Sequence, residues 1–345
     1  MPVLLGNMDY MQSREERGPG LLSIIVPMFN EEASIDALFA RLLDMVNRHG
    51  LNTEIICVND GSADGTWDRL VLWRSRIDNL VLVNLSRNFG KEIAITAGLD
   101  VAEGNAVVIM DGDLQHPPET ILEFIKMWRA GFDIVYGVRS DRKHDGALRG
   151  WLSNMFYRVF NSLSKTPITP DAGDFRLMDR KVVDAIRRMR ERARFMKGIY
   201  SWVGFKSVSV EFDVEERRHG KSSFSPMRLF ALAFDGLLSF STAPLKAAVL
   251  IGAAFALFAI SLGMYYMLRT MLLGVDVPGY ASIIVSTLAL SGLILLQLGL
   301  MGLYLGRIYE EVKARPLYLV RDIVGKAPTE KSVSANTMQQ IKDLV

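Results

Sequence analysis

The sequence contains only one cysteine and has almost no net charge. The first observation excludes a fold held by disulfides within the chain, and the second gives no support to a nucleic-acid-binding protein. Cys57 cannot form a disulfide within the chain, which is typical of a protein kept in a reducing compartment. It lies in an apolar run, so we predict that it is a small core side chain. The net charge is only +2, and no overall field favours a nucleic-acid partner.

The N-terminal residues 1–20 are largely polar and charged and lack the apolar core of a signal peptide. We expect a flexible N-terminus followed by a domain that is not exported. The chain also has no internal repeat and no low-complexity tract, which leaves repeat architectures out of consideration.

Two long runs, residues 247–268 and 280–306, contain no charged residue. Each is longer than the roughly 20 residues that cross a bilayer as a helix. We therefore predict two transmembrane helices within residues 244–307. Lys246 precedes the first run, and Arg307 and Lys313 follow the second. By the positive-inside rule, both flanks and the large N-terminal domain lie in the cytosol.

Residues 21–138 alternate between strand-like and helix-like patterns, which predicts an α/β domain with a mainly parallel sheet covered on both faces. From 149 to 203 the pattern is helical, and 205–214 alternates as a strand does. We place the domain at 21–215, a basic loop and an interfacial amphipathic helix at 216–243, and a cytosolic tail at 308–345. The predicted strands are 21–27, 54–59, 80–85, 105–110 and 132–138, and the predicted helices are 31–48, 62–77, 92–101 and 117–129.

Asp111-Gly112-Asp113 directly follows an apolar run, where a buried strand ends. Ligands of open α/β sheets bind at the carboxyl ends of strands. Two carboxylates and the amide oxygen of Gln115 are ligands that Mg²⁺ or Mn²⁺ prefers, so Asp111, Asp113 and Gln115 form a candidate metal site. A plain turn after the strand is the alternative. We expect His116 to pack beside the two prolines that follow it.

Further polar side chains follow the neighbouring strands, at the same edge of the sheet. Asp60 could accept hydrogen bonds from a nucleobase or ribose, or it could cap the next helix. Glu32 adds a third carboxylate, and like charges on one rim repel unless cations or donors offset them. Arg87 and Lys91 could balance these carboxylates or bind a diphosphate; a surface ion pair with Glu92 is the alternative.

A second phosphate site is suggested by Arg139, Arg149 and Ser153, because the last two lie one helical turn apart. Asp174 is a further carboxylate. It could orient an acceptor or act as a base, or it could form a buried pair with Arg176 or Arg180.

Together these motifs resemble the polyprenyl-phosphate glycosyltransferases of glycosyltransferase family 2. That group includes dolichol-phosphate mannose synthases and bacterial bactoprenol (undecaprenyl-phosphate) glucosyltransferases. The resemblance covers roughly residues 20–310, and the two C-terminal runs favour the bacterial enzymes. The segments that carry it are Asp111-Gly112-Asp113-Leu114-Gln115-His116-Pro117, Val58-Asn59-Asp60-Gly61-Ser62, Ser86-Arg87-Asn88-Phe89-Gly90-Lys91-Glu92, Asp174-Phe175-Arg176-Leu177-Met178-Asp179-Arg180 and Phe195-Met196-Lys197-Gly198.

The resemblance implies a GT-A nucleotide-sugar domain and assigns roles to particular residues. Arg217 falls on the arginine of a loop that closes over the diphosphate. This loop departs from the family pattern, since Ser223 stands where a lysine is usual and Lys221 precedes it. The implied roles are metal binding for Asp111, Asp113 and Gln115; catalysis for Asp113 and Asp174; nucleotide-sugar binding for Pro27, Asn30, Glu32, Asp60, Lys91, Asp111 and Arg217; and lipid-phosphate binding for Arg139, Arg149, Ser153 and Lys221.

The function implied is inverting transfer of one sugar, from a donor such as UDP-glucose, to polyprenyl phosphate at the cytosolic face of the bacterial inner membrane. The metal is Mg²⁺ or Mn²⁺, and the partners are the nucleotide sugar, the lipid phosphate and the bilayer. A processive polysaccharide synthase is an alternative, but the Gln-x-x-Arg-Trp motif of that class is absent. A membrane protein that senses a nucleotide or lipid, and a transporter, are the others. A homo-oligomer stays open.

Overall fold

The structure, a computed structural model, describes residues 20–140, 173–192, 194–213, 243–273 and 279–325. The chain divides into two units. One contains the sheet and its helices, together with the strand that follows residue 316; the other contains two long helices. The predicted N-terminus and the loop and interfacial helix at 216–243 lie almost wholly outside the described residues.

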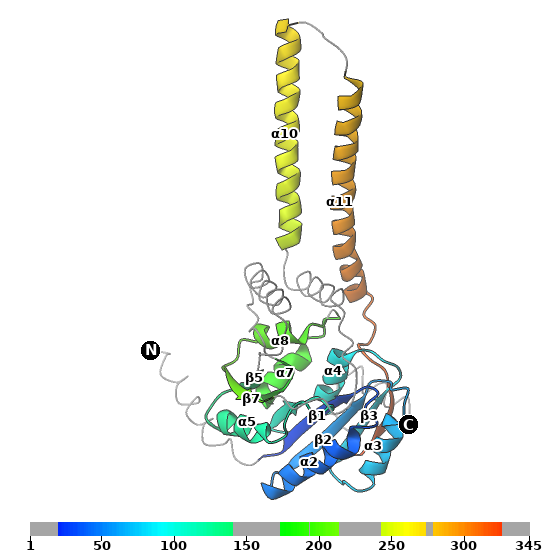
Figure 1. Ribbon diagram of the computed structural model, residues 1–345, viewed down its shortest axis with the longest axis vertical. Helices are drawn as coiled ribbons and strands as arrows, with labels where there is room; N and C mark the ends of the chain where they lie inside the picture. Colours follow the sequence, from blue (N-terminus) through cyan, green and yellow to red (C-terminus); the bar gives the residue numbers. More distant parts are fainter. Residues whose placement is uncertain (1–19, 141–172, 193, 214–242, 274–278, 326–345) are drawn as a thin grey trace. The chain divides into compact units, whose positions relative to one another are not determined.

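The first unit is built on an eight-stranded sheet in the order β7-β5-β6-β4-β1-β2-β3-β8. Strands β1, β2, β3, β5 and β7 of this sheet are labelled in Figure 1. Neighbours from β4 through β1 and β2 to β3 are parallel, as are β5 and β7; β6 and β8 run antiparallel to their neighbours. The predicted mainly parallel α/β fold is confirmed. The strands are β1 Leu22–Met28, β2 Thr53–Asn59, β3 Leu80–Leu85, β4 Ala106–Ile109, β5 Ile134–Arg139, β6 Arg176–Asp179, β7 Ser207–Phe212 and β8 Val320–Val324.

The helices of this unit bury apolar faces against the sheet. In α2 the buried side chains recur at helical spacing, from Ile35 through Leu38 and Phe39 to Leu42, as the sequence predicts. In α4 every residue from Ala94 to Val101 is buried, because this helix packs on β1 and β2. The helices are α2 Ile35–Arg48, α3 Thr66–Arg74, α4 Lys91–Val101, α5 Thr120–Arg129, α7 Arg180–Arg188 and α8 Met196–Trp202.

The central strands are buried on both faces, and this explains their continuous apolar sequences. All seven residues of β2 are buried, and Cys57 among them is fully enclosed. Burial raises the pKa of the Cys57 thiol, so the side chain stays a neutral core group, as predicted.

Strands β6 and β8 were not expected from the sequence. The segment 149–203 was predicted to be helical, yet Arg176–Asp179 pairs with β4 and β5. Val320–Val324 was expected in a C-terminal tail, yet it pairs with the edge of β3. Both strands are short and carry charged residues, so neither has the long apolar run that marks a buried strand.

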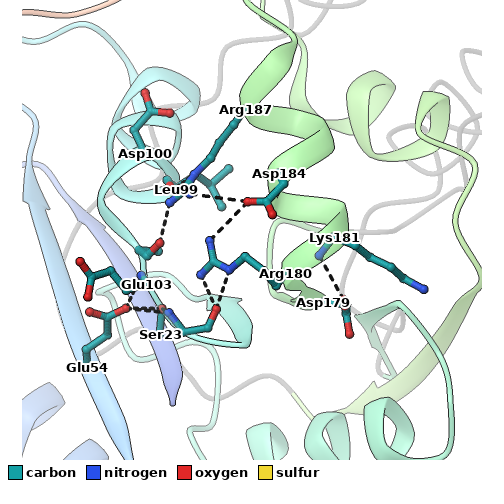
Figure 2. A network of polar contacts seen from close by, with 12 residues as sticks. Ser23, Glu54, Leu99, Asp100, Glu103, Asp179, Arg180, Lys181, Asp184 and Arg187 are labelled. Atoms are coloured by element: carbon teal, nitrogen blue, oxygen red, sulfur yellow. Dashed lines mark hydrogen bonds and ion pairs between the residues drawn. The ribbon is translucent and has the colours of Figure 1, made fainter. Parts of the chain in front are cut away.

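A polar network ties the amino edge of the sheet together (Figure 2). The Glu54 carboxylate accepts hydrogen bonds from Ser23 Oγ and from the amides of Glu103 (2.6 Å) and Gly104 (3.0 Å). Arg180 at the start of α7 donates to the carbonyl of Gly104 through Nε at 2.7 Å. These hydrogen bonds therefore join the start of β1, the start of β2, the residues before β4 and the start of α7.

The second unit contains α10 (Ala243–Leu273) and α11 (Tyr280–Val312). Leu245–Arg269 and Ser286–Val312 are long and apolar enough to cross a membrane, and these two candidate spans overlap the predicted ones. Gln297, a polar residue within the second span, donates to the carbonyl of Ala248 at 3.1 Å. This bond joins the two helices and gives the Gln297 side chain a partner within the chain.

Candidate active site

The carboxyl ends of β1, β2, β3 and β4 lie at one edge of the sheet because these strands are parallel. The segments that follow these strands place Asn30 and Glu32 after β1, Asp60 after β2, Lys91 at the start of α4 and Asp111 after β4. The structure therefore collects on one rim the carboxylates that the sequence placed at separate strand ends.

Lys91 joins two of the predicted site carboxylates. Its Nζ lies 2.6 Å from Asp111 Oδ1 and 3.0 Å from Asp174 Oδ2. Asp174 reaches this position because β6 pairs with β4 antiparallel, with Arg176 opposite Ile109. Residues that precede β6 therefore meet residues that follow β4, and a strand that the sequence did not predict brings the third charged group to the site.

The opposite charges of Lys91 and Asp174 each favour the ionised form of the other. Desolvation opposes the charged form of Lys91, but Asp111 and Asp174 outweigh it and raise the pKa of Lys91 above its usual value. Desolvation likewise opposes the charged form of Asp174, yet Lys91 and Arg176 lower its pKa. Asp174 therefore stays ionised at neutral pH, and its partner is Lys91 rather than Arg180, whose Nη1 lies 3.8 Å from Asp184 Oδ1.

The segment Asp111–His116 forms a compact polar turn after β4. Leu114 has φ 63°, an uncommon value for a residue with a side chain, and Asp113 Oδ1 accepts from the amide of Gln115 at 3.1 Å. No three His, Cys, Asp or Glu side chains gather as a metal site anywhere in the described ranges. A divalent cation here would have two carboxylates and the Gln115 amide oxygen, with further positions open for phosphate oxygens, which suits Mg²⁺ or Mn²⁺.

His116 is a core residue beneath this turn. Its ring stacks on Phe175 with centroids 4.6 Å apart and meets the edge of Phe212 at 5.6 Å. Nδ1 accepts from the amide of Asp111 at 3.2 Å, and burial lowers the pKa of the imidazole, so the ring is neutral. The sequence predicted packing of His116 beside the two prolines that follow it; the aromatic rings that contact it come instead from β7 and from the residue before β6.

Asn30 and Glu32 fasten the loop after β1 to the loop after β2. The amide of Asn30 donates to Ser62 Oγ at 2.9 Å, and Asn30 Oδ1 accepts from the amide of Ala63 at 2.8 Å. Glu32 Oε2 accepts from the amide of Gly65 at 3.0 Å. These contacts explain why α2 and α3 begin later than predicted, because the residues before each helix bond the other loop instead.

Asp60 shapes the loop that leads to Lys91. Its two oxygens accept from the amides of Phe89 at 2.7 Å and Gly90 at 2.9 Å. Burial raises the pKa of Asp60, against the lowering effect of these donors. Gly90 has φ 100°, which a residue with a side chain rarely adopts, so the tight entry to α4 needs glycine here.

The remaining predicted residues fall into two groups. Pro27 lies within β1 opposite Val58, and Arg139 ends β5 as an exposed residue whose charge helps to lower the pKa of His116. Arg149, Ser153, Arg217 and Lys221 lie outside the described residues.

Three residues that the sequence analysis did not assign to the site lie around Asp174. Glu92 is half-buried, and desolvation together with the charge of Asp174 raises its pKa to about 7. The Arg176 guanidinium lies 3.4 Å from the centroid of the Tyr200 ring. Arg176 Nε and the Tyr200 hydroxyl are buried without a hydrogen-bond partner among the described residues. Only the motif around Asp174 signalled this cluster, because Tyr200 arrives from a separate helix.

The sequence of this chain is similar to those of known proteins. Residues 23–187 match the model of the family described as "Glycosyl transferase family 2". A prophage bactoprenol glucosyl transferase homolog of Escherichia coli is 41% identical over 88% of this chain and 99% of its own length. An uncharacterized glycosyltransferase of Synechocystis sp. is 49% identical over 88% of this chain and 96% of its own.

A more distant likeness links the chain to a solved structure. The mannosyltransferase of Pyrobaculum calidifontis in complex with GDP-Man and Mn²⁺ is 18% identical over 89% of this chain and 93% of its own, with a TM-score of 0.46. At this distance the likeness carries no argument about the site.

Proposed function

Because the chain belongs to glycosyltransferase family 2, as one of its polyprenyl-phosphate glycosyltransferases, we propose that it transfers a single glucose from UDP-glucose to undecaprenyl phosphate with inversion. The observation that carries this proposal is the joining of Lys91, Asp111 and Asp174 at the carboxyl edge of the sheet, in a chain with two candidate membrane spans. The relatives named as bactoprenol glucosyl transferases support the choice of glucose and of the lipid carrier.

Asp111, Asp113 and Gln115 would hold the divalent cation, because they offer three oxygen ligands on one short turn. When bound, such a cation neutralises the diphosphate leaving group as a Lewis acid. Lys91 adds a positive charge at the same rim, within reach of the oxygens that Asp111 presents. We assign Lys91 to the diphosphate of the donor.

Asp174 acts as an orienting group rather than as a base. Its pKa is lowered by Lys91 and Arg176, and a carboxylate with a lowered pKa accepts a proton poorly at neutral pH. The acceptor needs little help, because a lipid phosphate is already anionic at pH 7. Asp174 instead fixes the ammonium group of Lys91, which it contacts at 3.0 Å.

The acceptor enters from the membrane in this proposal. Arg139, Arg149, Ser153 and Lys221 would hold its phosphate, Arg217 would close over the donor diphosphate, and the isoprenoid tail would stay in lipid. Strand β8 supports a hairpin topology. It follows α11 in the chain and pairs with β3, which supports the proposal that both flanks of the two candidate spans lie on the same side of the membrane. The basic flanks favour the cytosol for that side.

The direct test uses the purified full chain, Mn²⁺ and vesicles containing undecaprenyl phosphate. We expect radiolabel from UDP-glucose to enter the lipid fraction, and unlabelled UDP-glucose to compete better than GDP-mannose. Undecaprenol, which lacks the phosphate, serves as the matched acceptor and should stay unlabelled. Transfer to water alone, or label in a growing polysaccharide, would contradict the proposal.

A further inference from the structure

The strand that follows the membrane hairpin is fastened to the framework of the donor site. Residues 313–319 join α11 to β8, so β8 is the first element after the second candidate span. The amide of Ser86, at the start of the loop that leads to Lys91, donates to the carbonyl of Leu319 at 2.9 Å. Arg321 donates back to the carbonyl of Ser86 at 3.2 Å.

A buried contact holds the same segment against α4. The Tyr318 hydroxyl donates to Asp100 Oδ2 at 2.9 Å. Arg190 binds both oxygens of Asp100, at 2.8 and 2.9 Å, and Asp100 is only 1% exposed. Because α4 begins at Lys91, the segment before β8 contacts the helix whose first residue belongs to the candidate site.

A continuous series of hydrogen bonds runs from β8 to the loop after β1. Asp322 Oδ2 accepts from Asn84 Nδ2 at 2.9 Å, and Asn84 Oδ1 accepts from Asn59 Nδ2 at 2.9 Å. Asn59 Oδ1 accepts from the amide of Ser62 at 3.3 Å, and Ser62 Oγ accepts from the amide of Asn30 at 2.9 Å. We call these five residues the amide relay.

The two ends of the amide relay fix the direction of its middle. A carboxylate can only accept, so Asn84 must present its NH₂ to Asp322 and its oxygen to Asn59. Asn59 must then donate its own NH₂, which leaves its oxygen for the backbone donor of Ser62. Asn59 and Asn84 are 2% and 5% exposed, so water has little room to replace a lost partner.

We propose that Asp322 is a positioning residue for the donor site: it sets the orientation of two buried amides and so holds the contact between the loops after β1 and β2. The inference rests on the proposed function, because it takes these two loops to hold the nucleotide of the donor. It makes the strand beyond the membrane hairpin part of the donor-binding framework.

The consequence concerns binding more than chemistry. The amide relay does not include Lys91, Asp111 or Asp174. Reversing the donor and acceptor directions of its hydrogen bonds should therefore displace the nucleotide loops and leave the charged cluster in place. The affinity for the nucleotide and the KM for the donor should then change while kcat and the KM for the lipid acceptor change little.

The first experiment compares Asp322→Lys with Asp322→Asn in the full chain. Lysine presents only donors to Asn84, whereas asparagine keeps an acceptor oxygen. With UDP and Mn²⁺ as the probe, we expect Asp322→Lys to weaken the Kd by about tenfold, as loss of one part-buried hydrogen bond to a carboxylate implies. We expect Asp322→Asn to stay within about twofold of wild type. Asp78→Lys, an exposed residue at the other end of β3, is the control for charge reversal.

A second experiment exchanges the hydrogen-bond donor and acceptor between positions 84 and 322. Asn84→Asp places two carboxylates side by side and should weaken UDP binding. Adding Asp322→Asn should restore it, because the carboxylate introduced at position 84 could then accept from Asn59 and from the amide introduced at position 322. Rescue in the double variant is a result that a merely space-filling role for these side chains would not give.

Two results would overturn the inference. One is a Kd for UDP and a donor KM in Asp322→Lys that match those of Asp78→Lys. The other is an Asn84→Asp chain that the second substitution fails to rescue while both variants unfold at the wild-type temperature. The proposed function fails separately, when wild-type protein binds UDP but glucosylates no lipid phosphate.

Discussion

At the scale of single residues, Lys91 is shared between carboxylates from two separate elements. Its short contacts to Asp111 and Asp174 are the basis of the orienting role that we propose for Asp174. The sequence could predict Asp111 and Lys91, since each stands where an apolar strand gives way to polar residues. The contact between Lys91 and Asp174 could not be predicted, because these residues lie far apart in the sequence and only the pairing of β6 with β4 brings them together.

Glu92, the residue beside Lys91, gives a prediction for the pH dependence of stability. Burial and the charge of Asp174 raise its pKa from 4.5 to about 7. The unfolded chain loses this proton first as the pH rises, so Glu92 lowers the free energy of unfolding progressively between pH 4.5 and 7, and fully above pH 7. We expect Glu92→Gln to stabilise the protein by about 1–3 kcal/mol at pH 8 and to have little effect at pH 4.

Thermal unfolding of the full chain in detergent at these two pH values measures the effect of Glu92→Gln. Glu123→Gln is the control, since Glu123 is exposed and its ion pair with Lys126 should contribute less than about 1 kcal/mol. Equal stability of wild type and Glu92→Gln at pH 8 would show that Glu92 ionises freely in the folded protein.

At the scale of elements, the two edges of the sheet have different tasks. The amino edge joins strands through Glu54, whose carboxylate satisfies two backbone amides and the Ser23 hydroxyl. The carboxyl edge gathers Lys91, Asp111 and Asp174, the cluster that we propose as the site. The four central parallel strands could be predicted from their apolar runs, but the short strands β6 and β8 could not, because their place depends on partners far away in the sequence.

Glu54→Ala should destabilise the fold without changing the chemistry. The Glu103 amide and the Ser23 hydroxyl would lose their acceptor, whereas the Gly104 amide would keep Ser23 Oγ at 2.8 Å. We expect a loss of about 2–4 kcal/mol in the free energy of unfolding. Asp44→Ala is the matched control. It removes only an exposed pair with Arg48 on α2, worth about 0.3–0.5 kcal/mol. Urea unfolding and the kcat of the folded fraction should separate the effects; a kcat that falls with Glu54→Ala would place this network in the active machinery.

At the scale of the whole molecule, the pairing of β8 with β3 returns the chain to the sheet after the second candidate span. In the topology that we propose, both flanks of the two candidate spans lie on one side of the membrane and the segment between them lies on the other. Composition predicted the two spans. The return of the chain into the sheet could not be predicted, since β8 has the sequence of a polar tail.

Cysteine labelling in intact spheroplasts tests this topology. Cys57 is fully buried, so the wild-type chain should give little background. Gly279→Cys, which lies between the spans, should react with an impermeant maleimide. Arg315→Cys, after the second span, should react only when the membrane is opened. Reaction of both variants in sealed cells, or of neither, is incompatible with a hairpin that has cytosolic flanks.

The central claim is that Asp111 and Asp113 support a metal-assisted transfer of glucose to a lipid phosphate. The most direct test measures labelled glucose in the lipid fraction after EDTA treatment and after adding back Mn²⁺, for wild type and for Asp113→Ala. We predict that EDTA abolishes transfer by wild type, that Mn²⁺ restores it, and that Asp113→Ala stays at least about a hundredfold slower in both conditions while folding normally. Transfer that persists in EDTA, or near-normal turnover by Asp113→Ala, would contradict the account.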